Sequence, residues 1–244
     1  MKRSKIFNLF LPLIAAVLLM SSCESDSWHN IRGTGPVLSE TREVPIHRNL
    51  SVSIPADVYI YQSQERDLTI EAQGNILDAI ETYVSGSELR IGLENGAGLG
   101  NHEPIKIYIS SAMFNTIRLS GSVNLYSETQ IVTDEFDISI SGSGNVDVAV
   151  VANDVKASIS GSGKMWIEGT TLNEEFTVSG SGDIYSFGLL SETSDISISG
   201  SGKAEVKVTE YLNAHISGSG SVYFKGYPEV DSHVSGSGNV VHVN

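Results

Sequence analysis

Six side chains able to contact a carbohydrate recur along the second half of the chain at intervals of 18 to 21 residues. They are Tyr126, Asp147, Trp166, Tyr185, Glu205 and Tyr223. Aromatic rings offer flat apolar faces to a sugar ring, and carboxylates accept hydrogen bonds from its hydroxyl groups. If the fold aligns these positions on one outer face, they form a surface that can bind a glycan or a protein partner. The alternative is that aromatic residues stand there because they favour strands and stack on one another.

Seven Ser-Gly-Ser units punctuate the same region. Their glycines are Gly121, Gly142, Gly161, Gly180, Gly200, Gly218 and Gly236. In a glycine-rich calcium repeat an Asp follows the glycines, but here that position holds apolar residues such as Val146 and Met165. A phosphate-binding glycine loop opens a helix, whereas these units are followed by strand-like alternation. The corner serines are therefore expected to form structural ladders of hydroxyl groups, with an ice-binding or sugar-binding surface as the alternative.

Other reactive groups are sparse. His215 and His233 occupy equivalent positions in neighbouring repeats, but no third ligand accompanies them, so we expect a surface pair and no metal site. A glycosidase needs its carboxylates clustered around one bond. The paired acids Asp134–Glu135 and Glu174–Glu175 instead stand at expected loop starts, far from each other in the repeat, and are interpreted as solvated charges. We predict no catalytic residue, no metal and no cofactor.

The spacing of the glycines indicates the elements that position these side chains. A repeat of 18 to 21 residues is too short for helical repeats and suits one coil of a β-solenoid. Apolar and polar residues alternate on both sides of each corner, as in DISIS (residues 137–141) and NVDV (residues 145–148). One predicted inward column reads Leu119, Ile140, Ile159, Val178, Ile198, Ile216 and Val234. The predicted fold class is all-β, a parallel β-helix or β-solenoid, in which each coil buries its apolar face only by stacking on its neighbours.

We predict three segments: a secretory signal in residues 1–22, a tether from Cys23 through residue 48, and the solenoid from 49 to 244. The last strand pattern, GNVVHVN, carries no polar cap, so its open edge is expected to be shielded by a partner or by a second copy in a homodimer.

The first residues have the pattern of a secretory signal, with basic Lys2, Arg3 and Lys5 before an apolar run. Two small residues, Ser21 and Ser22, separate that run from the chain's one cysteine, Cys23, and the whole segment resembles a bacterial lipoprotein signal. This resemblance implies that residues 1–22 are a lipoprotein signal peptide and that Cys23 is lipidated. The alternative is an ordinary cleaved signal with an incidental cysteine. Glu24, Ser25 and Asp26 resemble the acidic tether that directs lipoproteins of the Bacteroidetes to the outer face of the outer membrane; a plain solvated linker is the alternative.

The charge balance limits the classes of partner. The formal net charge is −14, and the first 22 residues contribute three basic and no acidic groups, so the remainder carries 12 basic against 29 acidic groups. A surface this acidic argues against nucleic acid as a partner. The expected membrane contact is the lipid anchor alone.

Four stretches together resemble a known family: VSIPADVYI (residues 52–60), the pattern L-x-I-x-x-x-x-N from Leu68 to Asn75, SGSELRI (residues 85–91) and SGSGNVDV (residues 141–148). The chain is similar over residues 50–244 to the putative auto-transporter adhesin head domains common in lipoproteins of the Bacteroidetes. This resemblance implies a right-handed parallel β-helix, related in shape to pectin lyases, and it transfers no catalytic residue. The expected function is a surface-exposed outer membrane lipoprotein acting as an adhesin or ligand-binding solenoid. The alternatives are a non-binding structural envelope module and a polysaccharide lyase or hydrolase.

Overall fold

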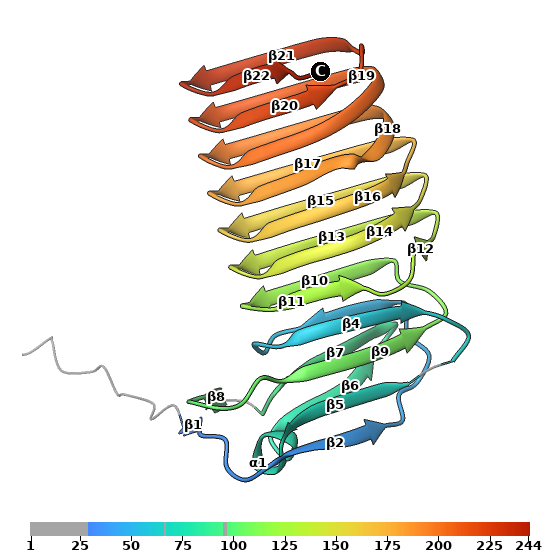
Figure 1. Ribbon diagram of the computed structural model, residues 1–244, viewed down its shortest axis with the longest axis vertical. Helices are drawn as coiled ribbons and strands as arrows, with labels where there is room; N and C mark the ends of the chain where they lie inside the picture. The colour runs from blue at the N-terminus through green and yellow to red at the C-terminus, as the bar shows by residue number, and fades with distance from the viewer. Residues whose placement is uncertain (1–28, 66, 95–96) are drawn as a thin grey trace, which may run out of the picture.

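The computed structural model describes residues 29–65, 67–94 and 97–244, and these form a parallel β-solenoid (Figure 1). The predicted signal peptide and Cys23 lie outside the described residues. The fold class predicted from the repeat is confirmed. Within the described part of the chain, no helix is long and apolar enough to cross a bilayer.

Two sheets lie face to face, and each regular coil contributes one strand to each of them. The first sheet contains the strands that lead into the corners, together with an antiparallel hairpin of β6 (Ile80–Ser85) and β7 (Glu88–Leu93) at its N-terminal end. The other strands of this sheet are β3 (Asn49–Val52), β10 (Thr116–Gly121), β13 (Glu135–Gly142), β15 (Asp154–Gly161), β17 (Asn173–Gly180), the second parts of β18 (Asp183–Gly200) and β19 (Lys203–Gly218), and β21 (Glu229–Gly236).

The second sheet contains the strands that leave the corners, together with strands of the N-terminal region and one short strand that follow other loops. They are β2 (Val37–Arg42), β5 (Leu68–Gln73), β9 (Lys106–Ser111), β4 (Asp57–Gln62), β11 (Asn124–Ser127), β12 (Ile131–Val132), β14 (Asn145–Val151), β16 (Lys164–Thr170), the first parts of β18 and β19, β20 (Ser221–Lys225) and β22 (Asn239–His242). Strands β18 and β19 run from the second sheet round into the first, and register shifts in their pairing mark that bend.

The Ser-Gly-Ser corners stack along one edge of the solenoid (Figure 1). The seven corner glycines have φ values between 91° and 136°, a range that side chains with a Cβ rarely adopt. Close stacking adds a second reason for glycine, because a Cβ on Gly161 would lie 2.3 Å from the carbonyl oxygen of Gly142 on the coil below. The following serine N–H donates to a glycine carbonyl one coil away, as from Ser162 to Gly142 at 2.9 Å. Backbone hydrogen bonds therefore hold the corner, and its serine side chains face solvent.

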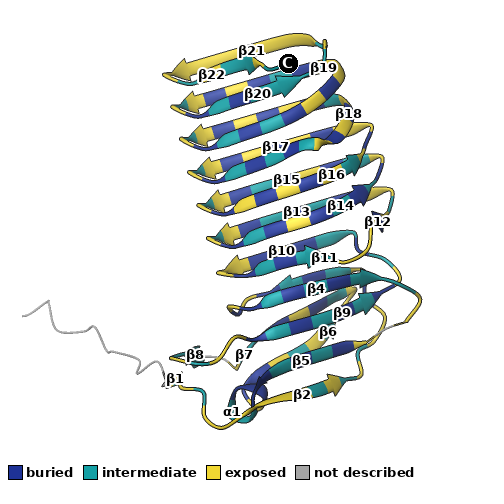
Figure 2. Cartoon of the chain, viewed as in Figure 1, coloured by how far each residue is buried: buried dark blue, intermediate teal, exposed yellow. Residues whose placement is uncertain are grey.

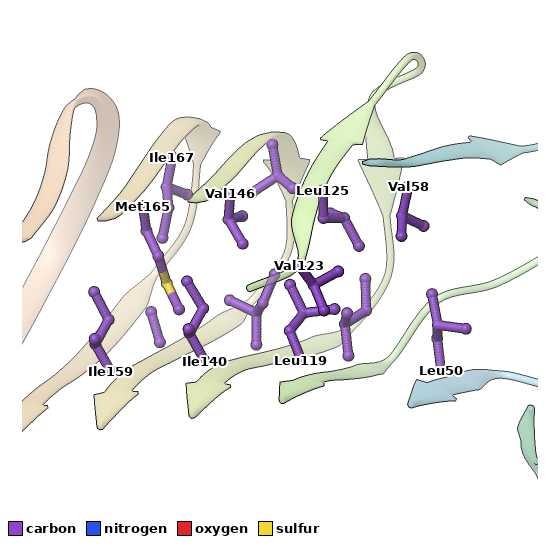
Figure 3. Packing of buried hydrophobic residues seen from close by; sticks show 14 of the residues in the cluster. Leu50, Val58, Leu119, Val123, Leu125, Ile140, Val146, Ile159, Met165 and Ile167 are labelled. Atoms are coloured by element: carbon purple, nitrogen blue, oxygen red, sulfur yellow. The ribbon is translucent and has the colours of Figure 1, made fainter. Parts of the chain in front are cut away.

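The core is the narrow space between the two sheets, filled by inward residues that alternate with outward ones (Figure 2). Figure 3 shows Leu119, Ile140 and Ile159 of the first sheet opposite Leu125, Val146 and Met165 of the second. All six are at most 2% exposed. The predicted inward column is buried from Leu119 to Ile216, while Val234 on β21 is 37% exposed because no coil covers it among the described residues. The expected pairing of two copies at this coil stays a prediction.

The N-terminal region departs from simple sequential stacking. The coil of β3 and β4 lies between the coil of β7 and β9 and the coil of β10 and β11, although it precedes both in the sequence. The antiparallel strands β5 and β2, together with the short helix α1 (Gly74–Leu77), close this end (Figure 1). Strand β1 (His29–Ile31) pairs with β8 (Ala97–Leu99). Part of the segment predicted as a tether is thus folded onto the solenoid.

Candidate functional site

Strand pairing places the predicted contact residues in one outward row on the second sheet. Consecutive partners along the row are Tyr108, Tyr59, Tyr126, Asp147, Trp166, Tyr185, Glu205, Tyr223 and Val241. We call the first eight of these the aromatic column. The structure brings all six predicted positions together and adds Tyr59 and Tyr108 to them.

The repeat spacing does not identify Tyr59 and Tyr108 as members of the column, because the coils that carry them do not stack in sequence order. Tyr108 lies below Tyr59, and Tyr59 lies below Tyr126, so the row reverses the chain direction for one step. A signal for Tyr59 was present, since the stretch ADVYI (residues 56–60) has the shape of GNVDV (residues 144–148) and puts Tyr59 at the place of Asp147. The repeat offered no comparable signal for Tyr108, which follows an irregular loop.

The rings form two separate stacks. In the lower stack the ring of Tyr59 lies 5.1 Å from that of Tyr108 and 5.4 Å from that of Tyr126, with interplanar angles of 15° and 23°. In the upper stack the rings of Trp166 and Tyr185 lie 5.2 Å apart at 12°. Parallel strands are about 4.8 Å apart, so residues paired on adjacent strands are naturally at stacking distance. Each stack is therefore a rigid apolar wall held by the strand spacing.

Partial burial in the lower stack also changes tyrosine acidity. Desolvation raises the pKa of Tyr126, and the negative charges of Asp57 and Asp147 raise it further. The pKa of Tyr108 is raised by desolvation and by Glu71 in the same way. These hydroxyl groups stay protonated at neutral pH, and that of Tyr108 donates a hydrogen bond to Oε2 of Glu71 at 3.5 Å.

A hollow separates the two stacks at Asp147, and we call it the Asp147 gap. It has a volume of about 480 Å³ and is lined by Tyr126, Asn145, Val146, Asp147, Lys164 and Trp166. Asp147 is exposed and carries no ring, so the ring stacking is interrupted between Tyr126 and Trp166. Trp166 is 42% exposed, which leaves part of its surface open to a ligand.

The second interruption of the column, at Glu205, has a different structure. The Nζ of Lys203 lies 4.2 Å from the centre of the Tyr185 ring and 2.8 Å from Oε1 of Glu205. This lysine covers the Tyr185 face through a cation–π contact and an ion pair. The space between Tyr185 and Tyr223 is therefore occupied by the protein's own side chain.

A hydrogen-bonded ladder runs beside the aromatic column. Nδ2 of Asn124 donates to Oδ1 of Asp57 at 2.8 Å, and Nδ2 of Asn145 donates to Oδ1 of Asn124 at 2.9 Å. The ladder fixes the Asn145 amide with its own oxygen directed away from that bond. Next in this row is Lys164, which takes part in none of the ion pairs found within the described residues. The Asp147 gap thus combines aromatic walls with fixed amide, carboxylate and ammonium groups.

The outer face of the first sheet carries different chemistry. Arg90 and Arg118 both bind the carboxylate of Glu88, at 2.6 Å and 2.8 Å, beside a row of hydroxyl residues. The pairing places His215 opposite His233, with ring centres 6.1 Å apart. No group of three or more metal-ligating side chains is found among the described residues.

The position of Glu174 contradicts one expectation from the sequence, which is that Glu174 is a solvated charge at a loop start. Strand β17 instead begins at Asn173 and turns Glu174 inward between Val155 and Ser194. Glu174 is only 2% exposed there. Burial raises its pKa to about 8, and the hydroxyls of Ser194 and Ser191 offset only part of that rise, since neither carboxyl oxygen makes a hydrogen bond of standard geometry. The alternation of the strand begins earlier than the sequence suggested, and this accounts for the error.

Comparison with known proteins connects this architecture to adhesin-like domains. A family model described as "Putative auto-transporter adhesin, head GIN domain" matches residues 47–228. A solved structure described as a putative adhesin from Bacteroides fragilis NCTC 9343 is 25% identical, with a TM-score of 0.84, and the alignment covers 88% of this chain and 100% of that one.

Two solved structures from Parabacteroides distasonis ATCC 8503 show the same fold. A putative adhesin is 22% identical with a TM-score of 0.73, and a putative lipid binding protein is 24% identical with a TM-score of 0.75. Each alignment covers 88% of this chain and 100% of the other. No curated protein matches the chain.

Proposed function

We propose that this chain, which belongs to the family of putative auto-transporter adhesin head GIN domains, is a cell-envelope adhesin that binds glycans along the aromatic column. One observation carries the proposal: a single straight row on the outer surface holds two ring stacks with polar groups between and beside them. Sugar rings present apolar C–H faces and hydroxyl edges, and this surface offers aromatic faces and hydrogen-bonding groups in matching alternation.

The test is binding of the full-length protein to an array of immobilised glycans. An adhesin of this kind binds at least one neutral glycan, and a structural envelope module binds none. A polysaccharide-degrading enzyme would instead release reducing ends or unsaturated products from the same sugars. Binding to a host glycoprotein that survives enzymatic removal of its glycans would assign the column to a protein partner and overturn the proposal.

We also propose that the protein is a surface-exposed lipoprotein of the outer membrane, anchored through lipidated Cys23. The support is the signal-like N-terminus and the position of the chain's one cysteine directly after it. A Cys23→Ser variant is expected to leave the membrane fraction and to lose incorporation of labelled fatty acid. Labelling that persists in this variant would contradict the anchor. Digestion of the wild-type protein on intact cells by an added protease tests surface exposure.

A further inference from the structure

The Asp147 gap has the dimensions of one missing ring in an otherwise regular stack. Where adjacent strands both carry rings, their centres lie 5.1 to 5.4 Å apart. Tyr126 and Trp166 are separated by the strand that carries Asp147, so their backbones are about 10 Å apart. A six-membered ring placed midway would stand about 5 Å from each aromatic ring, within the range of favourable stacking.

The walls of the gap are fixed before any ligand arrives. Tyr126 is backed by Tyr59, and Trp166 is backed by Tyr185, each at stacking distance. A site that needs no ordering of its side chains loses less entropy on binding. The gap is therefore preorganised for a flat or chair-shaped ring.

The polar lining indicates which kind of ring fits. The carboxylate of Asp147 accepts hydrogen bonds, the ammonium of Lys164 donates them, and the Asn145 amide, whose Nδ2 donates to Asn124, can accept through its oxygen. Aromatic ligands present few hydroxyl groups at their edges, whereas a pyranose presents several. The acidic surface of the protein disfavours a polyanionic sugar.

We propose that the Asp147 gap is a subsite for one pyranose ring of a neutral glycan, held between Tyr126 and Trp166 with its hydroxyl groups directed to Asp147, Asn145 and Lys164. This inference rests on the proposed glycan binding and narrows it to one place on the column. The Glu205 interruption is no such subsite, because Lys203 already covers the Tyr185 face there.

Two tyrosine substitutions provide a matched pair of variants. Asp147→Tyr fills the gap with a ring and makes the column continuous from Tyr126 to Trp166. Thr177→Tyr adds the same ring at an exposed outward position of the first sheet, outside the aromatic column. Both substitutions are on an outer strand face, where tyrosine is well tolerated, and thermal melting checks that both variants fold.

Two measurements test the inference, and both use the full-length protein. The first is binding to the glycan array. The second is titration of Trp166 fluorescence with methyl glucoside, methyl galactoside, methyl mannoside and methyl N-acetylglucosaminide, in a Trp28→Phe background that leaves Trp166 as the chain's one tryptophan. In that background we expect at least one of these sugars to change the Trp166 emission saturably. Asp147→Tyr is expected to weaken both signals by about tenfold or more, and Thr177→Tyr to leave them within about twofold.

The outcomes separate this inference from the proposed function. Full array binding by a folded Asp147→Tyr variant would overturn the subsite and leave glycan binding elsewhere on the column intact. An equal loss in both variants would also overturn it, because the gap would then have no special role. Failure of the wild-type protein to bind any glycan would overturn the proposed function and the subsite with it.

Discussion

Trp166 and Tyr185 stack across two neighbouring coils, with ring centres 5.2 Å apart and planes 12° from parallel. Their contact follows from strand pairing, because Trp166 and Tyr185 are direct register partners on β16 and β18. The solenoid thus converts a repeat of about 20 residues in the sequence into a ring spacing of about 5 Å in space. Any function of the aromatic column depends on how accurately the corners and the core maintain that spacing.

The corners should tolerate no side chain at the stacked glycines. Gly161→Ala places a Cβ 2.3 Å from the Gly142 oxygen at a φ of 130°, and we expect it to lower the free energy of unfolding by about 3 kcal/mol or more. Gly86→Ala is the control, since Gly86 also has a positive φ, of 64°, but nothing lies within 4 Å of its Cβ position. It should cost about 1 kcal/mol. Chemical denaturation of both variants measures the difference, and equal losses would mean that close stacking of the corners is unimportant.

The core between the sheets should be sensitive to truncation. Phe176 is fully buried, and Phe176→Ala is expected to cost about 3–5 kcal/mol through lost burial and the cavity left behind. Thr177→Ala, on the next residue of β17 but on the outer face, should change stability by no more than about 1 kcal/mol. The melting temperatures of the two variants test this, and a smaller loss for Phe176→Ala than for Thr177→Ala would contradict the inward assignment.

Glu174 should make the stability of the solenoid depend on pH. Its pKa is about 8 when folded against 4.5 in a solvated chain, so between these values the unfolded state is ionised while the folded state holds its proton. The contribution of Glu174 to stability is therefore greatest below about pH 4.5, falls by at most about 1.4 kcal/mol per pH unit as the pH rises, and stops falling above about pH 8. Glu174→Gln removes this trend, so the variant should gain stability relative to wild type as the pH rises from 5 to 8.

The measurement is denaturant unfolding of wild type and Glu174→Gln across that pH range. Glu175→Gln is the control, because Glu175 is the exposed neighbour whose carboxylate pairs with Lys156 on the surface. Its difference from wild type should stay within about 1 kcal/mol at every pH. Parallel pH profiles for wild type and Glu174→Gln would show that the buried carboxyl has no such effect.

Lys203 should keep the Glu205 interruption closed. Replacing it in Lys203→Ala removes both the cation–π contact to Tyr185 and the ion pair to Glu205. If the space between aromatic rings is what admits a sugar, this variant should bind glycan at two places, which raises the stoichiometry measured by calorimetry. Lys207→Ala, at an exposed outward position farther along the same strand, should not raise it. An unchanged stoichiometry in Lys203→Ala would contradict the role given to this lysine.

The C-terminal half of the fold could be predicted because every coil there follows the same rule, an alternation of inward and outward residues on both sides of a glycine corner. Alternation around Gly142 or Gly161 determines which side chains face inward, and the glycine spacing determines which residues become neighbours on adjacent coils. The same rule is enough to align Tyr126, Trp166 and Tyr185 from the amino-acid sequence alone. It does not extend to the coil order at the other end, where β3 and β4 stack between later strands.

The properties that depend on side-chain contacts could not be read from the repeat. Asp147 and Glu205 occupy equivalent positions, and the contacts of Lys203 with Tyr185 and Glu205 distinguish the closed interruption from the open one. The burial of Glu174 likewise depends on where β17 begins, and a shift of one residue would have turned this carboxyl outward.

The most direct test of glycan binding by the aromatic column compares the wild-type protein with a Trp166→Ala/Tyr185→Ala/Tyr223→Ala variant on one glycan array. A control variant, Ser139→Ala/Ser158→Ala/Thr177→Ala, changes the same number of outward residues on the opposite sheet. We predict that the wild type and the control bind the same glycans and that the aromatic variant loses this binding. Unchanged binding by the folded aromatic variant would contradict the assignment of the column as the binding face.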